Sequence, residues 1–193
     1  MPLDPQTLTP GARRILDAAA ALFYELGITA VGVDLIAERS GVTKRTLYDR
    51  FGSKDVLVAT YLAERDQRWR AEVTAALERP GLSALDRVTA PFDALAAWTA
   101  QHSRGCAFIN ALAELPDGGH PAREVAADEK RWLLALFERL AAEAGLADAA
   151  PLAGELLCLH EGALVVGSVL PGDAIGDAGR AARALIAARA WSG

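Results

Sequence analysis

Apolar residues recur at three- and four-residue spacing along almost the whole chain, and glycine or proline interrupts the pattern at short intervals. This spacing is typical of amphipathic α-helices, and no stretch shows the alternating pattern of a β-strand. The sequence therefore predicts an all-α protein of about nine helices. The first helix begins at the capping pair Thr9 and Pro10 and ends at Gly27.

Two short helices are predicted at residues 34–40 and 44–51, on either side of a sharp turn at Gly41. Glycine is favoured where a helix ends in the left-handed conformation, and Thr43 can cap the second helix. The inward face of this second helix is apolar. Its outward face carries Lys44, Arg45, Tyr48 and Asp49. A basic, aromatic helix of this size fits the major groove of DNA, so we interpret the pair as a DNA-binding helix-turn-helix.

A larger set of residue types stands at fixed spacing around these two helices, within residues 10–60. The set comprises Ala18, Phe23, Gly27, Ile36, Ala37, Gly41, Val42, Thr46, Leu47, Tyr48, Phe51, Lys54 and Leu57. This pattern resembles the N-terminal DNA-binding domain of TetR-type transcriptional regulators. The resemblance implies a helix-turn-helix domain at residues 1–52, followed by a helical effector-binding and dimerisation domain at residues 53–193.

The predicted DNA-binding residues lie on the second short helix or beside its ends. They are Thr43, Lys44, Arg45, Thr46, Tyr48, Arg50 and Lys54. The resemblance implies that Lys44 and Arg45 face bases, whereas Thr46, Tyr48 and Lys54 contact phosphates. Lys54 also follows a predicted helix start, where backbone amides and the helix dipole favour an anion.

Two places depart from the family pattern. Val31 and Gly32 stand where the family usually has threonine or serine, so the hydroxyl that caps the first short helix is missing. Glycine is still a tolerable cap. Arg50 stands where histidine is common, and we expect it to add a phosphate contact.

The composition indicates that the basic charge available for DNA binding is a local patch on an otherwise acidic chain. The chain has 193 residues, 52% of them hydrophobic, and a net charge of −5, which fits one or two modest domains with a sizeable core. Residues 1–60 hold seven basic and seven acidic groups, so the excess acidity belongs to the rest of the chain. This distribution argues against a protein that coats nucleic acid without specificity.

The cellular setting follows from what the chain lacks. It has only two cysteines, Cys106 and Cys158, and no paired-cysteine zinc motif, which fits a reducing cytoplasm. The first eleven residues have no secretory pattern, and we expect them to form an unstructured arm. The apolar run at 156–170 is too short to span a bilayer comfortably, and His160 interrupts it.

The remaining helices form the body of the protein. A long helix from Ser53 to about Glu78 joins the two domains, and others follow at about 83–104, 106–115, 120–144, 148–170 and 177–191. The apolar faces between residues 82 and 170 are wider than a lone helix needs. Such faces line pockets for small molecules, with a few polar anchors, although the same spacing also fits a plain core.

The predicted effector site combines aromatic residues with polar interruptions of apolar helices. Its members are Phe92, Trp98, Phe108, Asn110, Glu114, Trp132 and His160. His160 alone also fits a satisfied core histidine or a dimer contact. Together, Glu114 and Glu161 favour a cationic or hydrogen-bond-donating group on an otherwise apolar effector.

The last two helices carry more apolar surface than a monomer should expose, and small residues permit close helix approach. The predicted dimerisation residues are Leu156, Leu159, Ala163, Val166, Leu170, Ala181, Leu185 and Ala188. A twofold dimer presents two DNA-reading helices and therefore requires a palindromic operator.

Other classes of protein fit less well. An enzyme is disfavoured because no HExxH, GxSxG or glycine-rich phosphate loop occurs, and no cofactor or metal is expected. A metal sensor built from His102, Cys106, His120 and His160 lacks ligand spacing. A redox sensor through Cys106 and Cys158 remains an alternative. The sequence favours a cytoplasmic repressor that binds a palindromic operator as a homodimer and is released by a small molecule.

Overall fold

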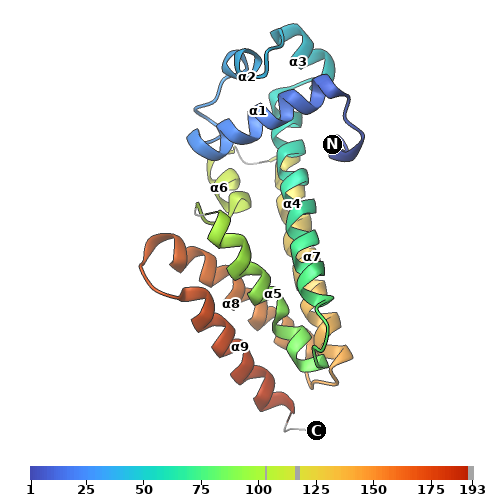
Figure 1. The fold of residues 1–193 in the computed structure, drawn as a ribbon, viewed down its shortest axis with the longest axis vertical. Coiled ribbons are helices and arrows are strands. Elements are labelled where there is room, and N and C mark those ends of the chain that lie inside the picture. Colours follow the sequence, from blue (N-terminus) through green and yellow to red (C-terminus); the bar gives the residue numbers. More distant parts are fainter. Residues whose placement is uncertain (103, 116–117, 191–193) are drawn as a thin grey trace. The chain divides into compact units, whose positions relative to one another are not determined.

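The computed structural model describes residues 1–102, 104–115 and 118–190, and this part of the chain is entirely helical (Figure 1). The all-α prediction is therefore confirmed. Its elements are η1 (Pro5–Thr7), α1 (Pro10–Leu26), α2 (Val33–Ser40), α3 (Lys44–Phe51), α4 (Lys54–Leu77), α5 (Ala84–Gln101), α6 (Ala107–Glu114), α7 (Pro121–Glu143), α8 (Ala149–Val169) and α9 (Ala174–Ala190).

Local caps set most of these boundaries. The hydroxyl oxygens of Thr9 and Thr43 accept hydrogen bonds from backbone N–H groups at the starts of α1 and α3. Ser83 and Asp86 form a reciprocal capping box at the start of α5. Gly41 adopts a left-handed φ of 67° between α2 and α3, as its place in the sequence predicts.

Two expectations need correction. The last helix begins at Ala174, three residues before the expected start, because Asp173 accepts a hydrogen bond from the N–H of Gly176 and caps the earlier turn. Its expected end at Trp191 lies outside the described residues. The N-terminal arm is ordered against the helices that follow: the N–H of Leu3 donates to Thr60 in α4, 3.0 Å away.

Contacts divide the chain into two compact units. Unit 1 comprises residues 1–68 and 107–128, and unit 2 comprises residues 69–106 and 129–193. The helices α4 and α7 each contribute residues to both units. The predicted boundary after residue 52 separates DNA binding from the other functions and does not follow from these contacts, so it stays a prediction.

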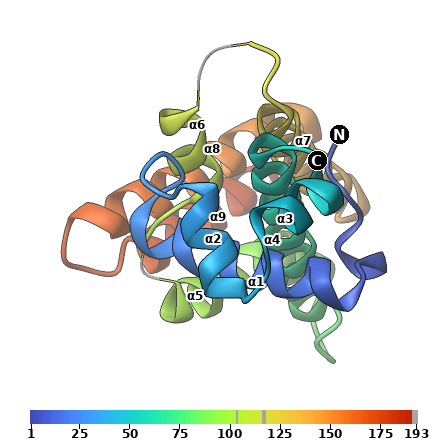
Figure 2. The ribbon, with the colours of Figure 1, turned by 90° about the horizontal axis from the view of Figure 1, so that it is seen from above.

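Unit 1 holds the predicted DNA-binding helices. In it, α1 packs against α2 and α3, and α2 packs against α3 (Figures 1 and 2). Ile15 and Leu16 of α1, Ile36 of α2, and Leu47 of α3 are fully or almost fully buried. These apolar side chains fix α3 by one face and leave its other face on the surface.

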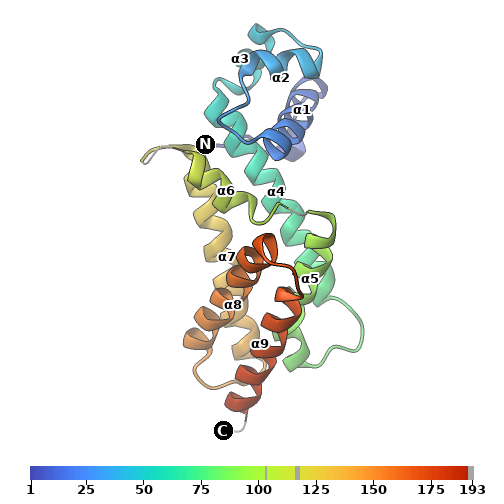
Figure 3. The same ribbon diagram turned by 90° about the vertical axis from the view of Figure 1, so that its left-hand side faces the viewer.

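In unit 2, α9 packs against both α5 and α8, which places three helices side by side (Figure 3). Phe92, Leu95, Phe137 and Leu152 lie in its buried core. By length and composition alone, α8 could cross a membrane; within the described residues no other helix passes that test. A third of its most apolar stretch is buried inside the protein.

Candidate nucleic-acid interface and effector region

The outward face of α3 is the centre of the candidate interface. Lys44, Arg45 and Arg50 are exposed, and Tyr48 is 42% exposed although it is a large aromatic residue. Leu47 and Phe51 are buried on the opposite face. As the sequence predicts, α3 therefore presents a basic and aromatic surface to solvent.

Two of these basic side chains have acidic neighbours. The ammonium of Lys44 lies 3.0 Å from a carboxylate oxygen of Asp34 in α2, and Arg45 lies 3.8 Å from Asp49. The hydrogen bond and charge of Asp34 raise the pKa of Lys44. Exposed ion pairs of this kind contribute little free energy, so phosphates or bases can replace the carboxylates as partners.

The two threonines at the start of α3 contact each other. The hydroxyl oxygen of Thr43 accepts from the backbone N–H of Thr46 at 3.1 Å, and the two hydroxyl groups lie 2.9 Å apart. Thr43 therefore acts as the helix cap. At the start of α2, Gly32 makes no side-chain cap, as its departure from the family pattern predicts.

Lys54 has a different environment from the exposed cations of α3. Its ammonium donates to the backbone oxygen of Ile28 at 2.7 Å, in the connection between α1 and α2. Burial lowers its pKa, while the charges of Glu114 and Asp55 act in the opposite direction. A phosphate contact by Lys54 must therefore compete with a hydrogen bond inside the protein.

Glu114, the last residue of α6, contacts the same connection. Its carboxylate accepts from the backbone N–H of Thr29 at 2.7 Å, and a Cβ atom at Gly27 would lie only 3.1 Å from both carboxylate oxygens. Burial of the carboxylate raises its pKa, but hydrogen bonds from the N–H groups of Thr29 and Ile28 outweigh this effect and lower it. Sequence reasoning placed Glu114 in the effector site and missed this contact, because its partners lie 85 residues away.

The predicted effector residues are divided between the two units. Phe108, Asn110 and Glu114 belong to unit 1, whereas Phe92, Trp98, Trp132 and His160 belong to unit 2. The predicted set therefore does not belong to one compact unit, and the effector site stays a prediction.

In unit 2, His160 is the centre of an aromatic cluster. Its ring centroid lies 5.6 Å from that of Trp69, 5.7 Å from Phe92 and 6.2 Å from Phe137. Trp98 joins the cluster through an edge contact with Trp69. Trp132 stands apart from these ring contacts and packs under the guanidinium of Arg70.

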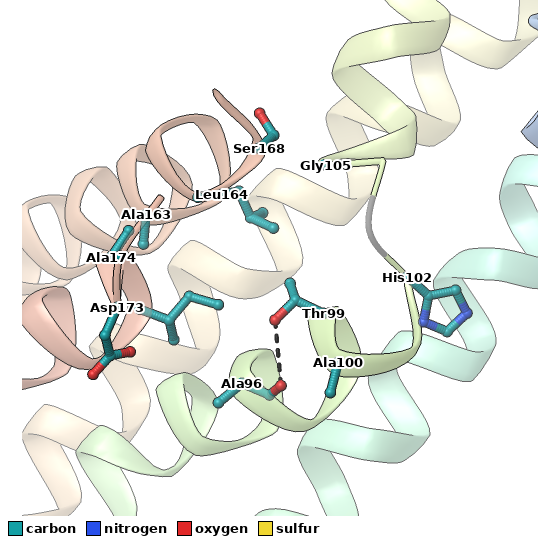
Figure 4. Close-up of a pocket in the computed structure, with 13 residues that line it drawn as sticks. Ala96, Thr99, Ala100, His102, Gly105, Ala163, Leu164, Ser168, Asp173 and Ala174 are labelled. Carbon is teal, nitrogen blue, oxygen red and sulfur yellow. Dashed lines mark hydrogen bonds between the residues drawn. The ribbon is translucent and has the colours of Figure 1, made fainter. Parts of the chain in front are cut away.

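A pocket of about 360 Å³ opens elsewhere in unit 2 (Figure 4). Small and apolar residues make up most of its wall, and Thr99, His102, Ser168 and Asp173 add polar groups. None of the seven predicted effector residues is among its lining residues in the described part of the chain. Sequence periodicity missed this pocket because alanines and glycines, rather than aromatic residues, form it.

The predicted dimerisation residues also separate into two groups. Leu156 is fully buried and Ala163 is 4% exposed, so both belong to the core of unit 2. Val166 and Leu170 are 45% and 59% exposed, as are their neighbours Val165 and Val169, at 57% and 75%. On α9, Ala181 and Ala188 are exposed and Leu185 is partly buried, as is Leu159 on α8.

The histidines do not converge on a metal site. His102 stacks on Trp98, His120 lies 3.4 Å from Asp55, and His160 lies in the aromatic cluster. Among the described residues, no group of three or more histidine, cysteine or acidic side chains could hold a metal ion.

Comparisons with known proteins agree with this geometry. Residues 15–61 match the family model described as bacterial regulatory proteins, tetR family. The chain is 36% identical over 62 residues to an HTH-type transcriptional regulator of Mycobacterium tuberculosis, a match that covers 32% of this chain and 31% of that protein. The chain thus matches about a third of the length of its curated relatives.

Solved structures extend the likeness over nearly the whole chain. A TetR-family transcriptional regulator from Streptomyces coelicolor is 31% identical with a TM-score of 0.83, over 96% of this chain and 97% of that one. A candidate TetR transcriptional regulator from Streptomyces avermitilis is 32% identical with a TM-score of 0.80, over 94% and 99% of the two chains. The family consists of DNA-binding proteins without enzymatic activity, which confirms the prediction that this is not an enzyme. The chain belongs to the TetR family of transcriptional regulators.

Proposed function

We propose that this protein is a cytoplasmic repressor that binds a palindromic operator as a homodimer and leaves it when a small molecule binds. The observation that carries the proposal is the outward face of α3, where three basic residues and a half-exposed tyrosine are fixed by a buried apolar face. A helix held in this way can enter the major groove without rearranging the fold.

The proposed DNA contacts divide between bases and phosphates. Lys44 and Arg45, near the start of α3, are assigned to bases, because the first residues of a recognition helix reach base edges. Thr46, Tyr48, Arg50 and Lys54 are assigned to phosphates. Phosphate contacts position the protein and make binding salt-dependent, whereas base contacts give it sequence preference.

The proposed dimer uses the exposed end of α8. Val165, Val166, Val169 and Leu170 form a run of exposed apolar side chains, which is unusual for the surface of a monomer. The exposed alanines of α9 permit close approach of a second copy. Leu156 and Ala163 are left out of the interface, because this chain buries them itself.

The pocket in unit 2 is the favoured effector site. Its volume of about 360 Å³ and its mainly apolar wall suit a small molecule with one or two polar groups. The aromatic cluster of Phe92, Trp98 and His160 remains the second candidate. An effector that prefers one state by about 1 to 3 kcal/mol changes operator affinity about 5- to 150-fold, and operator DNA weakens effector binding by the same factor.

A gel shift with DNA that flanks the protein's own gene tests this function, first alone and then with panels of small molecules. The expected result is a shifted band that survives competition by random DNA and disappears with at least one compound. If random competitor DNA abolishes the shifted band as well as unlabelled specific DNA does, the proposed operator recognition is wrong. If the protein binds this DNA specifically but activates transcription from it in a purified system, the proposed repression is wrong.

A further inference from the structure

The pocket in unit 2 lies among the ends of three helices (Figure 4). Among its lining residues, Thr99 belongs to the last turn of α5 and Ser168 to the last turn of α8, whereas Asp173 caps the start of α9. Two carboxyl-terminal helix ends and one amino-terminal end therefore border the same space. The charge that these ends and side chains carry determines which polar group the pocket accepts.

The helix ends at the pocket carry partial charges. The last carbonyl oxygens of a helix have no partner within it, and they give its C-terminus about half a negative elementary charge. Two such ends favour a cation. The N-terminus of α9 favours an anion but already has one, because a carboxylate oxygen of Asp173 accepts a hydrogen bond from the N–H of Gly176 at 2.9 Å. A full carboxylate charge exceeds the partial charge of one helix end, so the pocket as a whole is negative.

The hydroxyl groups of the pocket wall have already donated their protons. The hydroxyl of Thr99 donates to the backbone oxygen of Leu95 at 2.9 Å and lies 3.3 Å from that of Ala96, as Figure 4 shows. The hydroxyl of Ser168 donates to the backbone oxygen of Val165 at 2.8 Å. What these side chains present to a ligand is therefore the lone pairs of their oxygens, which accept hydrogen bonds.

Positive side chains do not cancel this negative character. Among the lining residues that the structure describes, none is a lysine or an arginine. The ring of His102 stacks on Trp98 and lies 2.9 Å, through Nδ1, from the backbone oxygen of Trp98, to which it must donate because a carbonyl oxygen only accepts. The guanidinium of Arg180 lies 3.7 Å from Asp173 and also pairs with Asp177, and all three side chains are largely exposed. Exposed ion pairs contribute little free energy, so a ligand cation can share the carboxylate of Asp173.

We propose that the pocket selects small apolar cations, such as cycloalkyl amines, over carboxylates of the same shape. The inference rests on the proposed function, in which this pocket holds the effector. An ammonium group has three donors and no acceptor, which matches a wall of oxygens. The hydrocarbon part of the ligand contacts Leu164 and Ile175. Neither Glu114 nor Glu161 is among the described lining residues, so the preference has a different origin from the one that the sequence suggested.

The test measures binding to the full chain without DNA, so that it does not depend on operator recognition. The probes are cyclohexylmethylamine, cyclohexylmethanol and cyclohexanecarboxylate, which share one ring and differ in the polar group. Titrations followed by ligand-observed NMR give the dissociation constants. The amine should bind about fivefold or more tightly than the alcohol, the carboxylate should bind most weakly, and high salt should reduce the difference. Equal affinities, or tightest binding of the carboxylate, would overturn the proposal.

A matched pair of variants locates the effect. Asp173→Asn removes the charge and keeps an oxygen that can cap Gly176, so it should weaken amine binding about two- to fivefold and strengthen carboxylate binding. Asp177→Asn removes the same charge from the first turn of α9 and from the same arginine, but Asp177 does not line the pocket. It should bind the amine like wild type. Equal losses in both variants would mean that the amine responds to the charge of the whole chain, and the proposal would be wrong.

The ligand class and the proposed release from DNA can fail separately. If the amine binds selectively but does not release operator DNA in the gel shift, the chemistry of the pocket is supported and the proposed release by such an effector is wrong. If other compounds release operator DNA while the amine does not bind, the proposed function stands and this inference is wrong. Ala100→Phe, which fills the pocket wall, should abolish amine binding. Unchanged binding to this variant would place the amine elsewhere and contradict the inference.

Discussion

At the scale of single residues, the candidate interface contains cations that now interact with other groups of the same chain. Lys44 and Arg45 contact carboxylates, and Lys54 donates to a backbone oxygen. The sequence predicted which of these side chains would face outward, because helical spacing determines direction. It could not predict the partners of Lys54 or Glu114, which depend on how distant segments pack.

Replacing Arg45 or Lys54 with alanine is expected to change DNA binding in two different ways. Arg45→Ala should cost about 1 to 3 kcal/mol of specific binding and relax the preference at one base pair. Lys54→Ala should weaken binding to all sequences alike and reduce the salt dependence. Fluorescence anisotropy with specific and random duplexes at several salt concentrations measures both effects. An equal loss on specific and random DNA for Arg45→Ala would remove its base-reading role.

Glu114 is expected to make unit 1 sensitive to acid. Because its pKa is lowered in the folded protein, its contribution to stability is present above the unfolded pKa and is lost as pH falls through the folded value. Urea midpoints of wild type and Glu114→Gln should therefore differ near pH 6 and converge towards pH 3. Glu138→Gln, at an exposed position on α7, serves as the control. If the difference between the two urea midpoints does not change with pH, the charge of Glu114 is not what stabilises unit 1.

At the scale of elements, caps and apolar spacing were enough to predict α1 to α4 and the start of α5 closely, whereas α5 ends at Gln101, before its expected end near residue 104. They were not enough for α8, where apolar residues occur on nearly every side. Periodicity could not separate Leu156, which this chain buries, from Val166, which it leaves exposed. Only packing against α9 and the rest of unit 2 determines which face of α8 is covered.

Val166→Arg is expected to break the proposed dimer without unfolding the chain, because it places a charge in the exposed apolar run of α8. Analytical ultracentrifugation at micromolar concentration should find a dimer for wild type and a monomer for the variant, with an unchanged circular dichroism spectrum. Leu134→Arg, at a separate exposed leucine on α7, should remain dimeric. A dimeric Val166→Arg protein would place the interface elsewhere.

At the scale of the whole molecule, the proposed function joins a proposed DNA-binding helix in unit 1 to a proposed effector pocket in unit 2. Family resemblance allowed both roles to be predicted from the sequence. The position of the pocket could not be predicted, because it is defined by small residues of α5, α8 and the turn before α9, and small residues carry little sequence signal.

Filling the pocket is expected to separate effector response from DNA binding. Ala100→Phe places a large ring in the pocket wall and should leave operator affinity unchanged while it reduces the response to an identified effector about tenfold or more. Ala97→Phe, at an exposed α5 position outside the pocket, should respond like wild type. Gel shifts with increasing effector measure both variants. A normal response from Ala100→Phe would assign the effector to the aromatic cluster or another site.

Selection of bound sequences from a pool of random DNA duplexes tests most directly whether the protein reads DNA as a twofold dimer through α3. The expected result is a palindromic motif whose half-sites lie about 34–36 Å apart, or a multiple of that distance. Arg45→Ala should lose information at the same position in both half-sites. Failure to enrich any motif, or enrichment of one without symmetry, would contradict this account.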